Sequence, residues 1–96
     1  MGVDQSVVAR IIGAKISYWR TLRGLSQSEL GKKAALSRVT ISKIERGVYN
    51  ETVSISNIIQ IADALGIDFT LLLNFSNQER SMWIPTTLNP DDNQGI

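Results

Sequence analysis

Basic and small polar side chains gather between residues 37 and 46, and they offer hydrogen-bond donors rather than catalytic groups. Side chains of these types donate to phosphate oxygens and to the edges of bases. The 96-residue chain contains no histidine and no cysteine, so it lacks the commonest general base, a thiol nucleophile and thiolate metal ligands. We therefore expect a binding protein and not an enzyme, with no catalytic residue, no cofactor and no metal site.

Charge is distributed unevenly along the chain, although the formal net charge is only +1. Residues 10–46 hold nine basic and two acidic residues, a local charge of +7, whereas the remainder holds one basic and seven acidic residues, a charge of −6. Such asymmetry suggests a surface for a polyanion. The alternative is a solvated helical surface, and charge alone does not decide between the two.

Capping residues and apolar periodicity predict an all-α fold in which helices position this surface. The predicted N-caps are Asp4, Ser26, Ser37 and Ser54. They begin helices over residues 5–22, 27–34, 38–46 and 55–65, and Glu29 completes a capping box with Ser26. The side chains expected to face one core are Val8, Ile12, Ile16, Trp19, Leu30, Ala34, Ile41, Ile44, Ile55, Ile58, Ile59, Ala62 and Leu65.

Residues 67–75 fit two predictions. Asp68 could cap a short fifth helix, but apolar residues also alternate with period two through this stretch, as in a β-strand. The compact domain of four to five helices is therefore assigned to residues 1–75. Residues 76–96 are polar, and we expect a flexible arm whose apolar island, residues 82–84, packs on its own domain or on a partner.

The second and third predicted helices are joined by three residues, and the open face of the third is rich in small polar and basic side chains. Two short helices joined so tightly are typical of a helix-turn-helix over about residues 26–46. In that motif the first helix crosses the DNA backbone and the second enters the major groove. The sequence therefore predicts binding to double-stranded DNA.

Two segments resemble the phage-repressor and Cro class of helix-turn-helix proteins, the Xre family. They are Leu25-Ser26-Gln27-Ser28-Glu29-Leu30-Gly31 and Ser37-Arg38-Val39-Thr40-Ile41-Ser42-Lys43-Ile44-Glu45-Arg46-Gly47. Residues 61–66 also resemble the fourth helix of that family, so the resemblance spans roughly residues 7–73 in one register. It implies a five-helix domain that regulates transcription, usually as a dimer on a palindromic operator.

The resemblance also implies roles for single residues. Gln27 would contact phosphate and brace the recognition helix, while Arg38, Val39, Ser42 and Lys43 would face base edges. Arg38 is suited to guanine O6 and N7, and Val39 to a thymine methyl. Independently of the resemblance, the N-cap Ser37 is expected to help fix the register on phosphates, and Ser42 and Thr40 are weaker candidates on the same helix. Arg46, Tyr49 and Asn50 would approach the backbone, and Arg20 would pair with Glu45 as a structural ion pair.

Two positions depart from the family pattern. Ala35 occupies the turn position where a glycine is usual, and a left-handed alanine costs about 1 kcal/mol. The connection after Gly47 is longer than is common, which leaves open whether Tyr49, Asn50 or Thr52 contacts phosphate.

The predicted function is sequence-specific DNA binding by a homodimer that regulates transcription as a repressor, with Leu71, Leu72 or Phe75 in the dimer interface. The alternative is an antitoxin that binds a toxin protein through residues 67–75 and the tail, and uses DNA binding for autoregulation. Within the first class, a phage regulator and a restriction–modification controller both fit. No apolar run approaches the ~20 residues of a membrane span, so we expect a cytoplasmic protein with no membrane partner.

Overall fold

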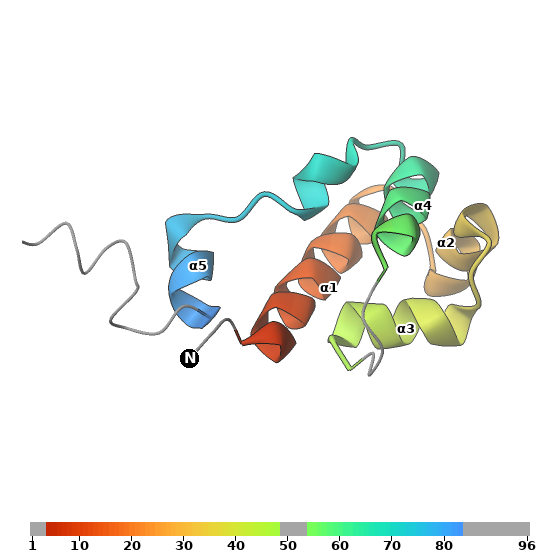
Figure 1. Cartoon of the computed structure of the whole chain (residues 1–96). Coiled ribbons are helices and arrows are strands. Elements are labelled where there is room, and N and C mark those ends of the chain that lie inside the picture. The colour runs from red at the N-terminus through yellow and green to blue at the C-terminus, as the bar shows by residue number, and fades with distance from the viewer. Residues whose placement is uncertain (1–3, 49–53, 84–96) are drawn as a thin grey trace, which may run out of the picture.

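The computed structural model describes residues 4–48 and 54–83, and every regular element in these ranges is helical. The elements are α1 (Gln5–Leu22), α2 (Gln27–Ala34), α3 (Arg38–Arg46), α4 (Ile55–Leu65), the 3-10 helix η1 (Phe69–Leu72) and α5 (Asn77–Trp83). In Figure 1, α1 crosses the middle of the molecule, α2 and α3 lie together at one end and α5 lies at the other. The predicted all-α fold class is confirmed.

The helices begin where the N-caps were predicted. The side chains of Asp4, Ser26, Ser37 and Ser54 each accept from a backbone N–H in the first turn of the helix that follows. At α2 the capping box is complete, because Ser26 N donates to Glu29 Oε1 at 2.8 Å and Glu29 N donates to Ser26 Oγ at 3.0 Å. These bonds satisfy amides that a helix leaves unpaired at its start, so they fix its first residue.

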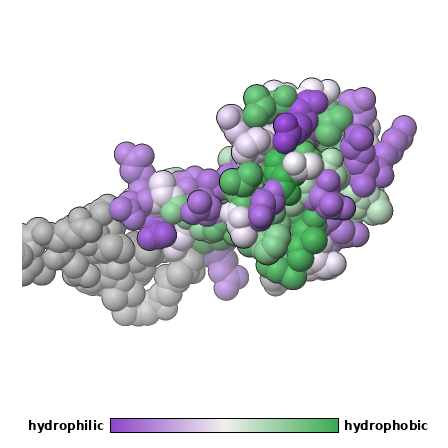
Figure 2. All heavy atoms as spheres, turned by 90° about the horizontal axis from the view of Figure 1, so that it is seen from above, coloured by the Kyte–Doolittle hydropathy of each residue, from purple (hydrophilic) through white to green (hydrophobic). Residues whose placement is uncertain are grey.

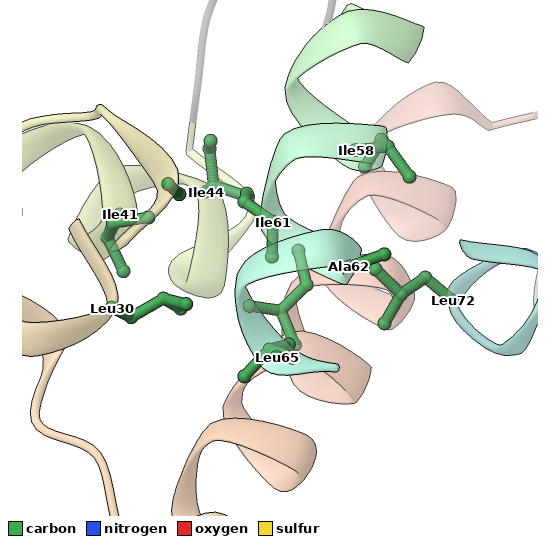
Figure 3. Packing of buried hydrophobic residues seen from close by; sticks show 10 residues of the cluster. Leu30, Ile41, Ile44, Ile58, Ile61, Ala62, Leu65 and Leu72 are labelled. Carbon is green, nitrogen blue, oxygen red and sulfur yellow. The ribbon is translucent and has the colours of Figure 1, made fainter. Parts of the chain in front are cut away.

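The core lies where α4 meets the other helices (Figure 3). Its fully buried large side chains come from four helices and η1, and they are Ile16, Leu30, Ile41, Ile44, Ile61 and Leu72. Burying an aliphatic side chain of this size contributes about 1.5–3 kcal/mol. The second and third helices are therefore held by their apolar sides, which leaves the opposite side of α3 in solvent.

Two of the side chains predicted to be buried on α4 are exposed. Ile55 is 60% exposed and Ile59 45% exposed, whereas Ile61, which was not predicted, is fully buried. The buried residues Ile58, Ile61, Ala62 and Leu65 follow the three- and four-residue spacing of a helix, so they occupy one arc of α4. On α1 the buried arc also differs from the prediction, because Val7 and Ile11 are buried whereas the predicted Val8 is only half-buried.

Residues 69–72 form η1, so the strand alternative for 67–75 is wrong in this stretch. Asp68 caps the turn, because its Oδ1 accepts from Thr70 N at 2.9 Å and from Thr70 Oγ1 at 2.7 Å. Leu72 is fully buried while Phe69 and Leu71 are 39% and 41% exposed, a pattern that a half-buried strand of period two does not produce.

The arm expected to begin at residue 76 instead starts with α5, which packs on α1. Ser76 and Glu79 form a reciprocal capping box, and Glu79 Oε2 lies 3.0 Å from Lys15 Nζ of α1. Trp83 stacks edge-on against Phe75 with ring centroids 5.0 Å apart, so this part of the apolar island packs on its own domain. Ile84 and residues 85–96 lie outside the described residues.

Over residues 4–48 and 54–83, none of the helices combines the length and the apolar character that crossing a membrane requires.

Candidate nucleic-acid interface

The turn between α2 and α3 contains a left-handed alanine, the strained conformation that the sequence predicted there. Ala35 has φ 59° and ψ 39°, which is left-handed, and it has the only positive φ of a non-glycine residue over the ranges that the structure describes. The next residue closes the turn, because Leu36 N donates to Gly31 O at 2.8 Å. Ser37 then begins α3, so the three-residue connection brings the two helices into contact at a sharp angle (Figure 1).

The outer side of α3 carries the predicted base-reading and phosphate-binding side chains. Ile41 and Ile44 point into the core, whereas Arg38, Lys43 and Arg46 are exposed and Val39 is 52% exposed. Thr40 and Ser42 are half-buried, and Ser42 O accepts from Arg46 Nε at 3.3 Å. The structure therefore brings three cations and one exposed aliphatic side chain together on one side of a nine-residue helix.

Ser37 is engaged in its own helix. Its Oγ accepts from Thr40 N at 3.0 Å and donates to Thr40 Oγ1 at 2.9 Å. The hydroxyl proton is therefore already used, and the groups that Ser37 leaves for a phosphate are backbone amides at the start of α3.

Glu45 joins three elements beneath the interface. Arg20 of α1 donates from Nε to Glu45 Oε2 at 2.7 Å and from Nη2 to Oε1 at 3.1 Å. Gln27 Nε2, at the first turn of α2, donates to the same Oε1 at 3.1 Å. Arg20 also donates from Nη1 to Leu25 O at 2.7 Å, and its bonds to Glu45 raise the pKa of its guanidinium.

This arrangement has two consequences for Gln27 and α3. The amide nitrogen of Gln27 is held by α3, which leaves its side-chain oxygen and its backbone amide at the start of α2 for other contacts. Glu45, the one acid of α3, has a side chain only 5% exposed and paired with Arg20, so it does not offset the cations on the outer side.

The second acid of the basic segment is also engaged. Glu29 accepts from the backbone of Ser26, and this bond lowers the pKa of its carboxyl below the ordinary value. It therefore stays charged at neutral pH and belongs to the start of α2, where a negative charge is favoured by the helix dipole.

Close contact between α1 and α3 depends on Gly13, which was not among the predicted site residues. A Cβ at Gly13 would lie 2.8 Å from the Glu45 carbonyl carbon and in closer contact with Ile44 O. Only glycine permits this approach without movement of the α3 backbone. The available signal was a glycine inside a long apolar helical pattern.

The remaining predicted residues are those after Gly47 and those proposed for a dimer interface. Tyr49 and Asn50, and Thr52 with them, lie outside the described residues. Of the three residues predicted for a dimer interface, Leu72 is fully buried in its own core and Phe75 is half-buried against Trp83 and under Lys15. Leu71 is exposed, so it is the one of the three whose apolar surface remains available.

A comparison with family models matches residues 16–72 to the family described as Helix-turn-helix, which is more than half of the chain. Among curated proteins, an uncharacterised HTH-type transcriptional regulator of Methanocaldococcus jannaschii is 32% identical over 65 residues, which cover 68% of this chain and 96% of that protein.

Solved structures agree with this match. The restriction-modification controller protein C.AhdI from Aeromonas hydrophila is 34% identical with a TM-score of 0.63, and the match covers 67% of this chain and 94% of that one. The hypothetical transcription factor NHTF from Neisseria is 28% identical with a TM-score of 0.67, covering 83% of this chain and 88% of that one.

Proposed function

The chain belongs to the helix-turn-helix family of DNA-binding transcriptional regulators, and we propose that it is a repressor that binds a palindromic operator as a homodimer. The observation that carries this proposal is the composition of the outer side of α3. Arg38, Lys43 and Arg46 are exposed there, while the one acid of the helix is tied inward to Arg20. A helix with cations outside and its acid inside suits the major groove of a polyanion.

Binding begins with phosphate contacts. The cations of α1 to α3 attract the DNA backbone and release condensed counterions. The backbone amides at the starts of α2 and α3, with Gln27, set the register of the protein on the phosphates. Arg46 adds a contact at the end of α3, and Tyr49 and Asn50 follow it in the chain as further candidates.

Bases are then read by α3. Arg38 lies in its first turn, where the recognition helix of this motif meets base edges, and it donates to guanine O6 and N7. Val39 contacts a thymine methyl, Lys43 reaches a base or a phosphate, and Ser42 with Thr40 adds weaker contacts. A twofold dimer presents two such helices to half-sites roughly 34 Å apart.

The antitoxin alternative loses its main support. It rested on a strand in residues 67–75 that would pair with another chain, and residues 69–72 form η1 instead. The restriction–modification controller role gains support, because C.AhdI carries that description and is 34% identical. An endonuclease gene beside the gene of this protein would favour that role over a phage regulator.

Selection of bound sites from random DNA tests the function, with the wild type and Arg38→Ala run in parallel. We expect the wild type to enrich an inverted repeat, and Arg38→Ala to lose preference at one position in each half-site at a cost of about 1–3 kcal/mol. Arg80→Ala, which removes the same charge from α5, is the matched control and keeps the wild-type site.

Different outcomes would contradict sequence-specific binding, the homodimer, base reading by Arg38 and repression. Failure of the wild type to enrich any sequence contradicts sequence-specific binding, and enrichment of a single half-site contradicts the homodimer. An unchanged site for Arg38→Ala removes Arg38 from base reading. A reporter gene behind the selected operator tests repression, since a repressor lowers its expression.

A further inference from the structure

We propose that Arg10, in the N-terminal half of α1, binds a DNA phosphate beside the C-terminal end of α3. This inference rests on the proposed function and adds a contact that lies before residues 16–72, the part of the chain matched to the family. Arg10 is exposed, and the contact would widen the footprint of the protein beyond the helix-turn-helix itself.

The position of Arg10 is fixed by the backbone of α3. Gly47 ends α3 with φ 68°, and a Cβ there would lie 2.7 Å from Arg10 Cα and 2.9 Å from Arg10 N. The same Cβ would also collide with Arg10 Cγ. The α1 backbone therefore passes directly over Gly47, and the side chain of Arg10 starts at the last turn of α3.

Gly13 fixes the same crossing one helical turn later. It lies three residues after Arg10, so the two residues share a face of α1. Gly13 meets the carbonyl groups of Ile44 and Glu45, and Arg10 meets Gly47. Because two backbone contacts define the crossing, the register of Arg10 against α3 is rigid, which is what a positioned phosphate contact requires.

The charges around this position leave the guanidinium available. Among the described residues, Arg10 takes part in neither of the two ion pairs and in no side-chain hydrogen bond. The nearest acid in sequence is Asp4, whose Oδ1 accepts from Ser6 N, Ser6 Oγ and Val7 N as the cap of α1. The hydrogen bonds from Ser6 and Val7 and, more weakly, the charge of Arg10 lower the pKa of Asp4, but Asp4 and Arg10 form no ion pair.

A cation of α3 lies next to the same point. Arg46 directly precedes Gly47, and its Nε donates to Ser42 O one turn back at 3.3 Å, so its side chain lies along the last turn of α3. An anion near this end of α3 would be attracted by the positive charges of both arginines. A phosphate fits this arrangement, because arginine binds it in a bidentate manner.

A structural role is the competing explanation. Carbonyl groups at a helix C-terminus attract a nearby cation. In that case Arg10 would stabilise α3 and leave DNA binding unchanged, so the experiment measures both properties.

The test compares Arg10→Gln with Arg80→Gln and with Arg10→Lys in the full chain. Affinity is measured on the selected operator and on a duplex of random sequence, across a series of salt concentrations. Loss of one phosphate contact lowers the slope of log K against log salt by about 0.9. We expect this change for Arg10→Gln on both duplexes with a several-fold loss of affinity, and the wild-type slope for Arg80→Gln and Arg10→Lys.

A neutral methylphosphonate placed at single positions of the operator identifies the phosphate. At one position the methylphosphonate should weaken operator binding by the wild type and leave operator binding by Arg10→Gln unchanged. An unchanged salt slope for Arg10→Gln, or a lowered melting temperature with unchanged affinity, overturns the proposal. If the wild type selects no operator, the proposed function fails, and the slope on the random duplex still decides the role of Arg10.

Discussion

Glu45 illustrates at the scale of a single residue how an acid can serve a DNA-binding surface. Its carboxylate accepts from Arg20 and from Gln27, so one side chain of α3 is bonded to α1 and to the start of α2. The predicted pairing of Arg20 with Glu45 is present in the structure. The bond from Gln27 accounts for the bracing that the family resemblance implied, and its contact with phosphate stays a proposal.

Removing the charge of Glu45 should lower the free energy of unfolding rather than change the base preference of α3. Glu45→Gln leaves Arg20, whose side chain is only 17% exposed, without its counter-charge. Breaking a buried pair from one side costs on the order of 3 kcal/mol. Chemical denaturation measures this loss, with Asp63→Asn on the exposed side of α4 as the control of equal charge change.

A double variant separates the pair from its surroundings. The double variant Arg20→Leu with Glu45→Leu removes both charges. Its loss of stability should be smaller than the sum of the losses measured for Arg20→Leu alone and for Glu45→Leu alone. Additive losses would contradict a direct interaction between the two side chains.

At the scale of elements, the turn between α2 and α3 carries a cost that glycine would avoid. Ala35 is left-handed and exposed, so its substitution touches no packed neighbour. The sequence predicted this strain because the position is set by the motif, and the structure confirms the backbone angle. The left-handed conformation of residue 35 sets the angle between α2 and α3 that leaves the outer side of α3 exposed.

Ala35→Gly should therefore stabilise the protein by up to about 1 kcal/mol, since glycine adopts the left-handed region without steric cost. Thermal unfolding measures the change as a rise of about 4–8 °C per kcal/mol for a domain of this size. Ala14→Gly, at an exposed position within α1, is the control and should lower stability by about 1 kcal/mol. Equal losses for both variants would contradict the strain at Ala35.

α5 was predictable from the same kind of motif. Ser76-Asn77-Gln78-Glu79 repeats the spacing of Ser26-Gln27-Ser28-Glu29, and both sets form a capping box in the structure. A flexible arm was predicted there instead, because residues 76–81 are polar. What composition did not reveal is the support from α1, where Lys15 binds Glu79 and lies 5.6 Å from the centroid of the Phe75 ring.

At the scale of the whole molecule, two surfaces away from α3 each carry several exposed apolar side chains. One is a groove between α1, η1 and α5, where Tyr18, Leu71 and Met82 are 60%, 41% and 61% exposed. The other is the outer side of α4, with Ile55 and Ile59. Figure 2 shows hydrophobic residues gathered on the helical domain beside hydrophilic ones. A homodimer would cover at least one of these surfaces.

Leu71→Glu and Ile59→Glu distinguish the two surfaces. We expect Leu71→Glu to shift the protein from dimer to monomer in sedimentation, because a buried charge at an interface costs several kcal/mol. Ile59→Glu makes the same change in charge on α4 and should leave the dimer intact. The reverse result would place the interface on α4, and a dimer unaffected by either variant would exclude both surfaces.

The sequence by itself determined the helix starts, the helix-turn-helix and the basic segment. These features depend on contacts within about four residues, such as the bonds of Ser26 and Ser37 to the amides of their own helices. Tertiary structure decided which arc of α4 is buried, that Leu72 belongs to the core, and that Arg10 meets Gly47. Each of these depends on how helices distant in sequence cross, and a periodic pattern identifies an apolar side of a helix without specifying the neighbour that covers it.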